Sequence, residues 1–275
     1  PPIRDLITMI EPVATLEDLA VNEITDGLLK EIVSRVKNGR KVLHEQGFKK
    51  KYRRGLAITA LFYGESGTGK THAAEAIAGE LGLDLYRIDL SRVISKYIGE
   101  TEKNLGRIFD GAKNSGAVLL FDEADALFGK RSEVNDAHDR YANQEISYLL
   151  QKMEEYQGLS ILTTNLADNM DTAFNRRINY KVVFPMTDTQ TRKSIWERIF
   201  PQETPTHNLN YAELADELEL TGAEIKNLAL RAAYIAAEAN EPVKMKHIRK
   251  ILKNELDKIG IRINDGVLLH WNKDE

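Results

Sequence analysis

A glycine-rich stretch early in the chain has the residue types and spacing of a phosphate-binding loop. It is the run Gly64-Glu65-Ser66-Gly67-Thr68-Gly69-Lys70-Thr71, followed by His72. An apolar, β-branched run precedes it and an Ala-rich segment with helical spacing follows, which is the strand–turn–helix context that such a loop requires. Glycines let backbone N–H groups point at phosphate oxygens, and the helix N-terminus adds a favourable dipole. The stretch therefore predicts binding of a nucleoside triphosphate, with Lys70 on the β- and γ-phosphates and the Thr71 hydroxyl on Mg²⁺.

Two adjacent acids, Asp122 and Glu123, follow a continuously apolar run at residues 117–121. Such a run fits a parallel strand that is buried on both faces. A carboxylate at the end of that strand can hold the hydration shell of Mg²⁺, which is the role predicted for Asp122. Glu123 would then polarise a water toward the γ-phosphate. A solvated turn is the plain alternative, but the phosphate loop upstream favours the chemical role.

Polar residues also follow a second apolar strand. Asn165 ends that strand, where its amide could bond the attacking water or the γ-phosphate, or could simply close a turn. Arg176 and Arg177 end a helical turn and cannot both reach the same local partner. They suit intrachain salt bridges, or they could supply positive charge to a phosphate held by a neighbouring subunit, as an arginine finger does.

Two other segments stand out by their side chains. Lys96-Tyr97-Ile98-Gly99 interrupts a strand-to-helix connection, and by itself Tyr97 fits a partly buried loop anchor. The run at residues 49–54 contains five Lys or Arg side chains around one Tyr. It fits a solvated loop, and a contact with nucleic acid or phosphate is the alternative.

These candidates lie on alternating strands and helices, which is typical of βαβ units around a parallel sheet. The predicted strands are 57–63, 83–88, 117–122, 159–164 and 180–185, and the helices between them are 70–81, 102–113 and 139–154. In residues 1–54 we expect an extended or irregular start and then a helix capped by Thr25 or Asp26. After residue 186 the segments 188–200, 210–217, 221–239 and 244–258 are predicted to be helices. The predicted organisation is an N-terminal extension (1–54), an α/β part (55–186), a helical lobe (187–260) and a tail (261–275).

Composition narrows the classes of protein that fit. A chain of 275 residues is long enough for one large core or two packed lobes, and a net charge of −4 gives no basic footprint for nucleic acid or anionic membrane. The absence of Cys excludes disulfides, thiolate zinc sites and Cys nucleophiles, and it suits a cytoplasmic protein. No apolar run approaches the roughly 18 residues of a membrane span, and no signal peptide is visible. Because the chain begins at Pro1 rather than Met, we expect residues upstream.

In this order the candidate segments resemble the AAA ATPase family, the ring-forming ATPases within the wider AAA+ superfamily. The matching segments are Walker A (64–71), Walker B (119–125), sensor 1 (163–165), the arginine-finger segment (174–177) and the first pore loop (95–102). The resemblance extends from about Leu16 to Leu252. Within the family, residues 81–155 look most like bacterial or phage ATPases with one AAA module. Some of those accompany contractile, phage-tail-like injection systems.

The resemblance implies an α/β P-loop NTPase fold with a five-stranded parallel sheet in the order 5-1-4-3-2 and a C-terminal helical lid. It implies a homo-oligomeric ring, in the family a hexamer, with ATP and Mg²⁺ sandwiched between subunits. Arg176 and Arg177 then become intersubunit fingers. Lys96, Tyr97, Ile98 and Gly99 become pore residues that grip extended polypeptide. A second pore loop would lie at 131–138.

Further residues are implied on the adenine side of the nucleotide. The segment 221–225 resembles the sensor-2 helix, but Glu224 follows Gly-Ala where some relatives place Arg, so no phosphate contact is assigned there. The residues expected near the base are Asp18, Leu19, Ala20, Ile195, Gly222 and Ala223.

The sequence thus predicts Mg²⁺-dependent ATP hydrolysis that drives remodelling of a protein client through the pore of a ring. A nucleotide-gated assembly factor that threads nothing is one alternative. A nucleic-acid motor or loader is another, which the negative net charge and the aromatic pore loop oppose. A P-loop phosphotransferase is a third, but Glu123, Asn165 and the paired arginines suit water as the acceptor. No HExxH zinc-protease signature follows the module.

Overall fold

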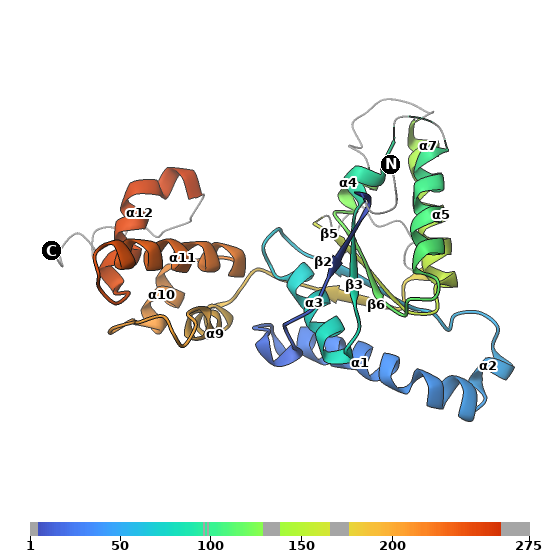
Figure 1. Ribbon diagram of the computed structural model, residues 1–275, viewed down its shortest axis with the longest axis horizontal. Helices are drawn as coiled ribbons and strands as arrows, with labels where there is room; N and C mark the ends of the chain where they lie inside the picture. Colours follow the sequence, from blue (N-terminus) through green and yellow to red (C-terminus); the bar gives the residue numbers. More distant parts are fainter. Residues whose placement is uncertain (1–4, 96, 98, 129–137, 166–175, 260–275) are drawn as a thin grey trace. The chain divides into compact units, whose positions relative to one another are not determined.

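A computed structural model of the chain describes residues 5–95, 97, 99–128, 138–165 and 176–259 (Figure 1). Its contacts divide the chain into two compact units. Unit 1 is 1–19, 23–66 and 70–184, and unit 2 is 20–22, 67–69 and 185–275. The predicted boundaries after residues 54, 186 and 260 stay predictions.

A six-stranded sheet is the centre of unit 1 (Figure 1). Its order is β1-β3-β4-β5-β2-β6, and neighbouring strands are parallel except for β1 with β3. Every residue of β4 is buried, which explains its continuously apolar sequence. The strands are β1 (Ile7–Ile10), β2 (Ile58–Tyr63), β3 (Leu85–Asp89), β4 (Val118–Asp122), β5 (Leu159–Thr164) and β6 (Tyr180–Val183).

The predicted five-stranded, all-parallel sheet is therefore wrong in strand count and in its complete order. The difference is β1, which pairs antiparallel with β3 at one edge and lies in the segment predicted to be extended or irregular. A four-residue strand whose burial does not alternate and in which no residue is fully buried gives little sequence signal. The other five strands follow one another as β3-β4-β5-β2-β6 and keep the predicted neighbours.

Long helices cover the sheet. α1 (Glu23–Arg40) and α3 (Lys70–Leu81) lie on one side, and α5 (Glu100–Ala112) and α7 (His138–Glu155) lie on the other (Figure 1). On the α5 and α7 side, Phe109 stacks on Phe121 with ring centroids 5.2 Å apart. The short elements are η2 (Leu16–Asp18), η3 (Lys41–Glu45), α2 (Phe48–Lys51), α4 (Leu90–Val93) and α6 (Asp125–Phe128).

The start of α1 corrects another prediction. The helix begins at Glu23, so Thr25 and Asp26 lie inside its first turn and not at its cap. Thr25 is buried, and its hydroxyl donates to the Val183 carbonyl at 2.9 Å. Thr25 therefore ties α1 to the end of β6, a long-range role that helix-capping patterns do not reveal.

Unit 2 is a helical lobe with its own apolar core. Its helices are α9 (Thr189–Ile199), α10 (Tyr211–Glu217), α11 (Gly222–Glu238) and α12 (Met245–Ile259). Trp196 is fully buried at the centre of a cluster with Leu214, Ile225 and Ile248. The buried Arg192 donates from Nε to the Ala215 carbonyl at 2.7 Å, which joins α9 to α10.

Candidate active site

The phosphate loop connects β2 to α3, and its backbone is one that only glycine tolerates at key points. A Cβ atom on Gly64 would lie 2.1 Å from the Phe184 carbonyl oxygen, closer than any real contact. Gly67 and Gly69 have φ values of +81° and +100°, in the region that side chains rarely allow. The backbone conformation of the loop therefore requires glycine at positions 64, 67 and 69.

Lys70 is the first residue of α3, and its side chain folds back onto the start of this loop. Its side chain is buried, and Nζ donates to the carbonyls of Gly64 and Glu65 at 2.6 and 2.8 Å and to Asn165 Oδ1 at 2.9 Å. The three ammonium donors thus meet three oxygens. Burial lowers the pKa of Lys70 from 10.5, while the charges of Asp125 and Asp122 act in the opposite direction. The structure brings together the predicted Lys70 and Asn165, which lie 95 positions apart in the sequence.

Asp122 ends β4 and is buried, with both carboxylate oxygens engaged. Its Oδ1 accepts from the Thr163 hydroxyl at 2.5 Å and from the Glu123 N–H at 3.2 Å. Its Oδ2 accepts from Arg87 Nε at 2.9 Å and from Arg87 Nη2 at 2.5 Å. The side chains of Arg87, Asp122 and Thr163 therefore form a row across the ends of β3, β4 and β5.

Glu123 has an unusual backbone conformation, with φ at +60°, although it is not a glycine. Its N–H donates to Asp122 Oδ1 and to Thr163 Oγ1, each at 3.2 Å, and its side chain is exposed. Strained backbone of this kind persists only where surrounding contacts impose it, and it concentrates at functional sites. Asp122 and Thr163 impose it here, and they place the Glu123 carboxylate in solvent beside the phosphate loop's edge of the sheet.

Asp125 and Arg87 belong to the same network but were not predicted as site residues. Asp125 accepts from the Thr164 hydroxyl, and its two carboxylate oxygens accept from the Asn165 N–H at 3.1 and 3.2 Å. Asp125 was visible as part of the acidic motif at 119–125. Arg87 pairs in register with Leu120, two residues before Asp122 and on the same face of the sheet, so only the strand pairing reveals it.

The residues predicted to bind Mg²⁺ have the type of donor atom that this ion prefers. The Thr71 hydroxyl and the Asp122 carboxylate are hard oxygen donors, which Mg²⁺ takes together with water and phosphate. Within the described ranges, no group of three or more His, Asp or Glu side chains could hold a metal by itself. Such a site would depend on the nucleotide for most of its ligands, and Arg87 already occupies one oxygen of Asp122.

The segment that carries this site is similar in sequence to a known protein family. Residues 60–186 match the family described as "ATPase family associated with various cellular activities (AAA)". The chain is 32% identical over 212 residues to "Cell division protein C" of Sulfolobus acidocaldarius, which covers 70% of this chain and 56% of that protein. The chain carries an AAA ATPase domain.

Other AAA relatives carry names tied to the proteasome. The chain is 32% identical over 185 residues to a proteasome-activating nucleotidase of Sulfurisphaera tokodaii, covering 64% of this chain and 47% of that protein. It is 29% identical over 215 residues to "26S proteasome regulatory subunit 4 homolog B" of Arabidopsis thaliana, covering 75% of this chain and 48% of that protein. The chain thus spans about half the length of the curated relatives it matches. The resemblance to ATPases of contractile injection systems stays a prediction.

The candidate pore loop of this AAA chain has its aromatic residue on the outside. Tyr97 is 75% exposed, and the turn that carries it is closed by a 2.6 Å bond from the Ser95 hydroxyl to Glu100 Oε2. Gly99 has φ at +78° and stands just before α5. Lys96, Ile98 and residues 131–137 of the second pore loop predicted at 131–138 lie outside the described residues, and His138 is the first residue of α7. An exposed Tyr on a braced turn differs from the partly buried anchor that residue type alone suggested.

The two arginines of the predicted finger have different surroundings. Arg177 is half-buried, and its Nη1 donates to the Ser147 carbonyl of α7 at 3.3 Å. Arg176 has an exposed side chain. Residues 174 and 175 of the predicted arginine-finger segment lie outside the described ranges. The pair therefore divides into one arginine that braces α7 and one that points into solvent.

The residues expected near adenine lie in both units. In unit 1, Asp18 Oδ2 accepts from the Thr15 N–H at 2.7 Å, and Leu19 follows it as the end of η2. In unit 2, Ile195 Cδ1 lies 3.6 Å from where a Cβ on Gly222 would be, so these two are neighbours. Ala20 and Ala223 also belong to unit 2. Their contact with adenine stays a prediction, as does a part for the exposed His72 in binding the nucleotide.

Proposed function

We propose that the chain is the ATP-hydrolysing motor of a homo-oligomeric ring that remodels a protein client. The observation that carries the hydrolytic part is Glu123, an exposed carboxylate on a left-handed backbone that Asp122 and Thr163 hold in place. Names of the relatives support the link to protein substrates, since two of those given above are named as a proteasome regulatory subunit and a proteasome-activating nucleotidase. The hexameric state, the client and a cytoplasmic location are part of this proposal.

In the proposed chemistry, Lys70, Asn165, Glu123, Thr71 and Asp122 each have one role. Lys70 exchanges its bonds to the Gly64 and Glu65 carbonyls for phosphate oxygens, and Asn165 keeps its orientation through Asp125. Glu123 takes the position of the group that orients or deprotonates the attacking water. Thr71 and Asp122 would hold Mg²⁺ and its waters, and the ion would supply positive charge to the phosphates.

Arg176 is our candidate for the arginine finger. Its exposed guanidinium can reach a phosphate held by another subunit, whereas Arg177 is engaged with α7. Arginine fingers raise hydrolysis rates by about 10³- to 10⁵-fold in other ATPases and GTPases. Arg177 in this account positions the segment that carries Arg176.

The test of the hydrolytic role is Glu123→Gln. The variant should bind ATP with affinity near that of the wild type but hydrolyse it roughly 10²- to 10⁴-fold more slowly, because only the carboxylate that activates water is lost. Phosphate release and binding of a fluorescent ATP analogue would be measured on the same preparation. Wild-type turnover by this variant would remove Glu123 from the mechanism. A pull-down with this trapped variant and ATP, read by mass spectrometry, would identify the client.

Tyr97→Ala separates threading from the nucleotide-gated alternative. Because Tyr97 is exposed on a braced turn, its removal should leave the fold and basal ATPase rate unchanged. In the threading account the variant loses unfolding of the client identified with the trap. Full unfolding activity in Tyr97→Ala would favour gating without threading.

A further inference from the structure

A groove lies at the edge of the sheet opposite the phosphate loop. It consists of two cavities of about 560 and 1050 Å³ that share Gly39, Leu43, Leu56 and Ile58 as lining residues. Its floor is the amino ends of β2, β5 and β6. Its walls are the last turns of α1 together with η3, α2 and the last turns of α7. Lys70, Asp122 and Asn165 lie at the carboxyl ends of the strands, so this basal groove is separate from the nucleotide site.

The charge of the basal groove is opposite to that of the chain. The two cavities are lined by six Lys or Arg and three Glu, whereas the whole chain carries −4. One of these acids, Glu155, is already paired with Lys152 at 3.5 Å. The cations are Arg35, Arg40, Lys41, Lys49, Arg53 and Arg54. The basic run at 49–54, which fitted a solvated loop by sequence, thus supplies half of them to a concave surface.

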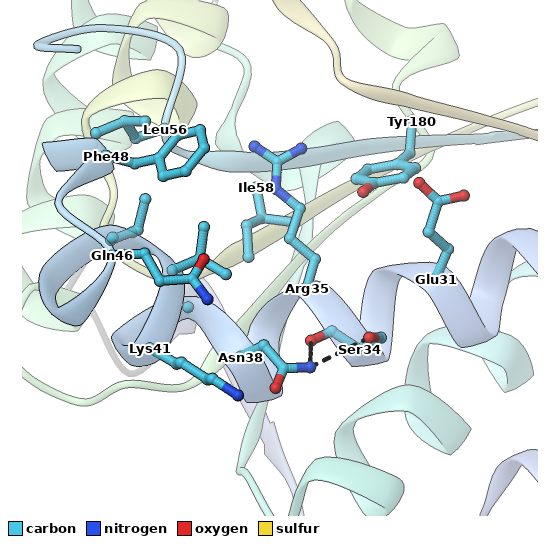
Figure 2. A pocket seen from close by; sticks show the side chains of 13 residues that line it. Glu31, Ser34, Arg35, Asn38, Lys41, Gln46, Phe48, Leu56, Ile58 and Tyr180 are labelled. Atoms are coloured by element: carbon cyan, nitrogen blue, oxygen red, sulfur yellow. Dashed lines mark hydrogen bonds between the residues drawn. The ribbon is translucent and has the colours of Figure 1, made fainter. Parts of the chain in front are cut away.

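Arg35 is the central cation of the smaller cavity. Figure 2 shows its side chain extending from α1 with Ile58 on one side and Tyr180 on the other. Its guanidinium carbon lies 5.5 Å from the centroid of the Tyr180 ring, and Nη2 donates to the Ala57 carbonyl at 3.4 Å. Arginine has five N–H donors in a planar fork that matches a carboxylate. The contact with the Tyr180 ring holds the Arg35 guanidinium in the cavity, where it can donate hydrogen bonds to a carboxylate bound in the groove.

Apolar side chains stand beside these cations. Phe48 and Tyr52 are each 46% exposed, and their rings are 6.0 Å apart. The π-helical turn η3 widens the end of α1, closed by the Gln46 N–H bonding the Lys41 carbonyl at 2.9 Å. Such turns are frequent at functional sites. The groove therefore offers an apolar surface and a cationic surface to the same occupant.

We propose that the basal groove binds an acidic polypeptide segment of a partner protein, one in which a carboxylate side chain neighbours a large apolar side chain. The carboxylate pairs with Arg35, the apolar residue packs on Phe48, Leu56 and Ile58, and further acids face Arg53 and Arg54. A nucleic-acid strand fits less well, because Glu31 and Glu154 line the groove and would repel a continuous phosphate backbone. This inference goes beyond ATP hydrolysis and adds a second site for a partner.

The experiment pans a random library of displayed peptides, about 12 residues long, against the wild-type chain and against three variants. Arg35→Gln removes the central cation, and Phe48→Ala removes exposed apolar surface. Lys50→Gln is the matched control, since Lys50 belongs to the same basic run but lines neither cavity. A fluorescein-labelled copy of the enriched peptide is then titrated by fluorescence anisotropy, and labelled oligo(dT) serves as the nucleic-acid probe.

We expect enriched peptides with Asp or Glu next to Leu, Ile or Phe. The affinity of the chain for these peptides should fall roughly ten-fold in Arg35→Gln and several-fold in Phe48→Ala, and it should stay unchanged in Lys50→Gln. Binding to the wild-type chain should weaken as added salt screens the charges. Basal ATPase activity should be the same in all four proteins. Because Phe48 is a surface residue, Phe48→Ala carries the test if Arg35→Gln fails to fold. No acid-containing consensus, equal binding by Arg35→Gln and Phe48→Ala, or tighter binding of oligo(dT) at these residues would overturn the proposal.

Discussion

At the scale of single residues, Asp122 makes more contacts than the magnesium-binding role predicted from the sequence requires. Its four bonds fix the backbone of Glu123, orient Thr163 and hold Arg87. The motif predicted Asp122 from its place after an apolar strand. Arg87 could not be predicted in the same way, because its contact depends on the register between β3 and β4 and not on any local pattern.

A double-mutant cycle tests this arrangement. Arg87→Ala should lower the free energy of unfolding by about 1–3 kcal/mol, because it leaves the nearly buried Asp122 carboxylate without its cation. Asp122→Asn should also destabilise the fold, and the two changes together should cost less than their sum by about 1–2 kcal/mol. Urea unfolding of the four proteins gives these energies. Additive effects would show that Arg87 does not hold Asp122.

At the scale of elements, the sequence was most informative where one local signal decides the structure. The helix predicted at 70–81 has those same bounds, since the phosphate loop fixes its start and a glycine follows its end. The four helices predicted after residue 186 agree with the structure to within one residue at every end, because each combines an apolar face with a capping residue or turn. β1 and Thr25 were misjudged, since a partner distant in the sequence decides both.

The cap of α9 gives a test at this scale. Asp188 Oδ1 accepts from the Thr191 N–H at 2.7 Å, and hydrogen bonds with Thr191 hold the pKa of Asp188 below its ordinary value of 3.8. Asp188→Ala should therefore lower the free energy of unfolding near neutral pH by about 1 kcal/mol. Because the folded pKa is depressed, this contribution is present above 3.8 and disappears as pH falls through the folded value.

Asp188→Asn is the control for that prediction, since an amide can cap the helix but does not titrate. Its stability difference from Asp188→Ala should not change between neutral and acid pH. A wild-type advantage that grew on acidification would contradict the assigned direction of the pKa. Thermal unfolding at several pH values measures all three proteins.

At the scale of the whole molecule, the chain carries an AAA ATPase domain. It covers about half of the curated relatives it matches, and no described helix is both long and apolar enough to cross a membrane. Among the described cations near the proposed site, the Lys70 ammonium already has three oxygen partners and Arg177 contacts α7, whereas the Arg176 side chain is exposed. We therefore expect activity to depend on neighbouring subunits and to rise with protein concentration.

The central claim is that Arg176 completes the site of a neighbour, and mixing two inactive variants tests it most directly. Lys70→Ala cannot bind ATP but keeps its arginine, whereas Arg176→Ala binds ATP but lacks the finger. Mixed in equal amounts and allowed to exchange subunits, the two should regain about a quarter of wild-type ATPase activity, because that share of interfaces joins an intact site to an intact finger. If the mixture stays as inactive as its components although subunits exchange, Arg176 does not act across the interface.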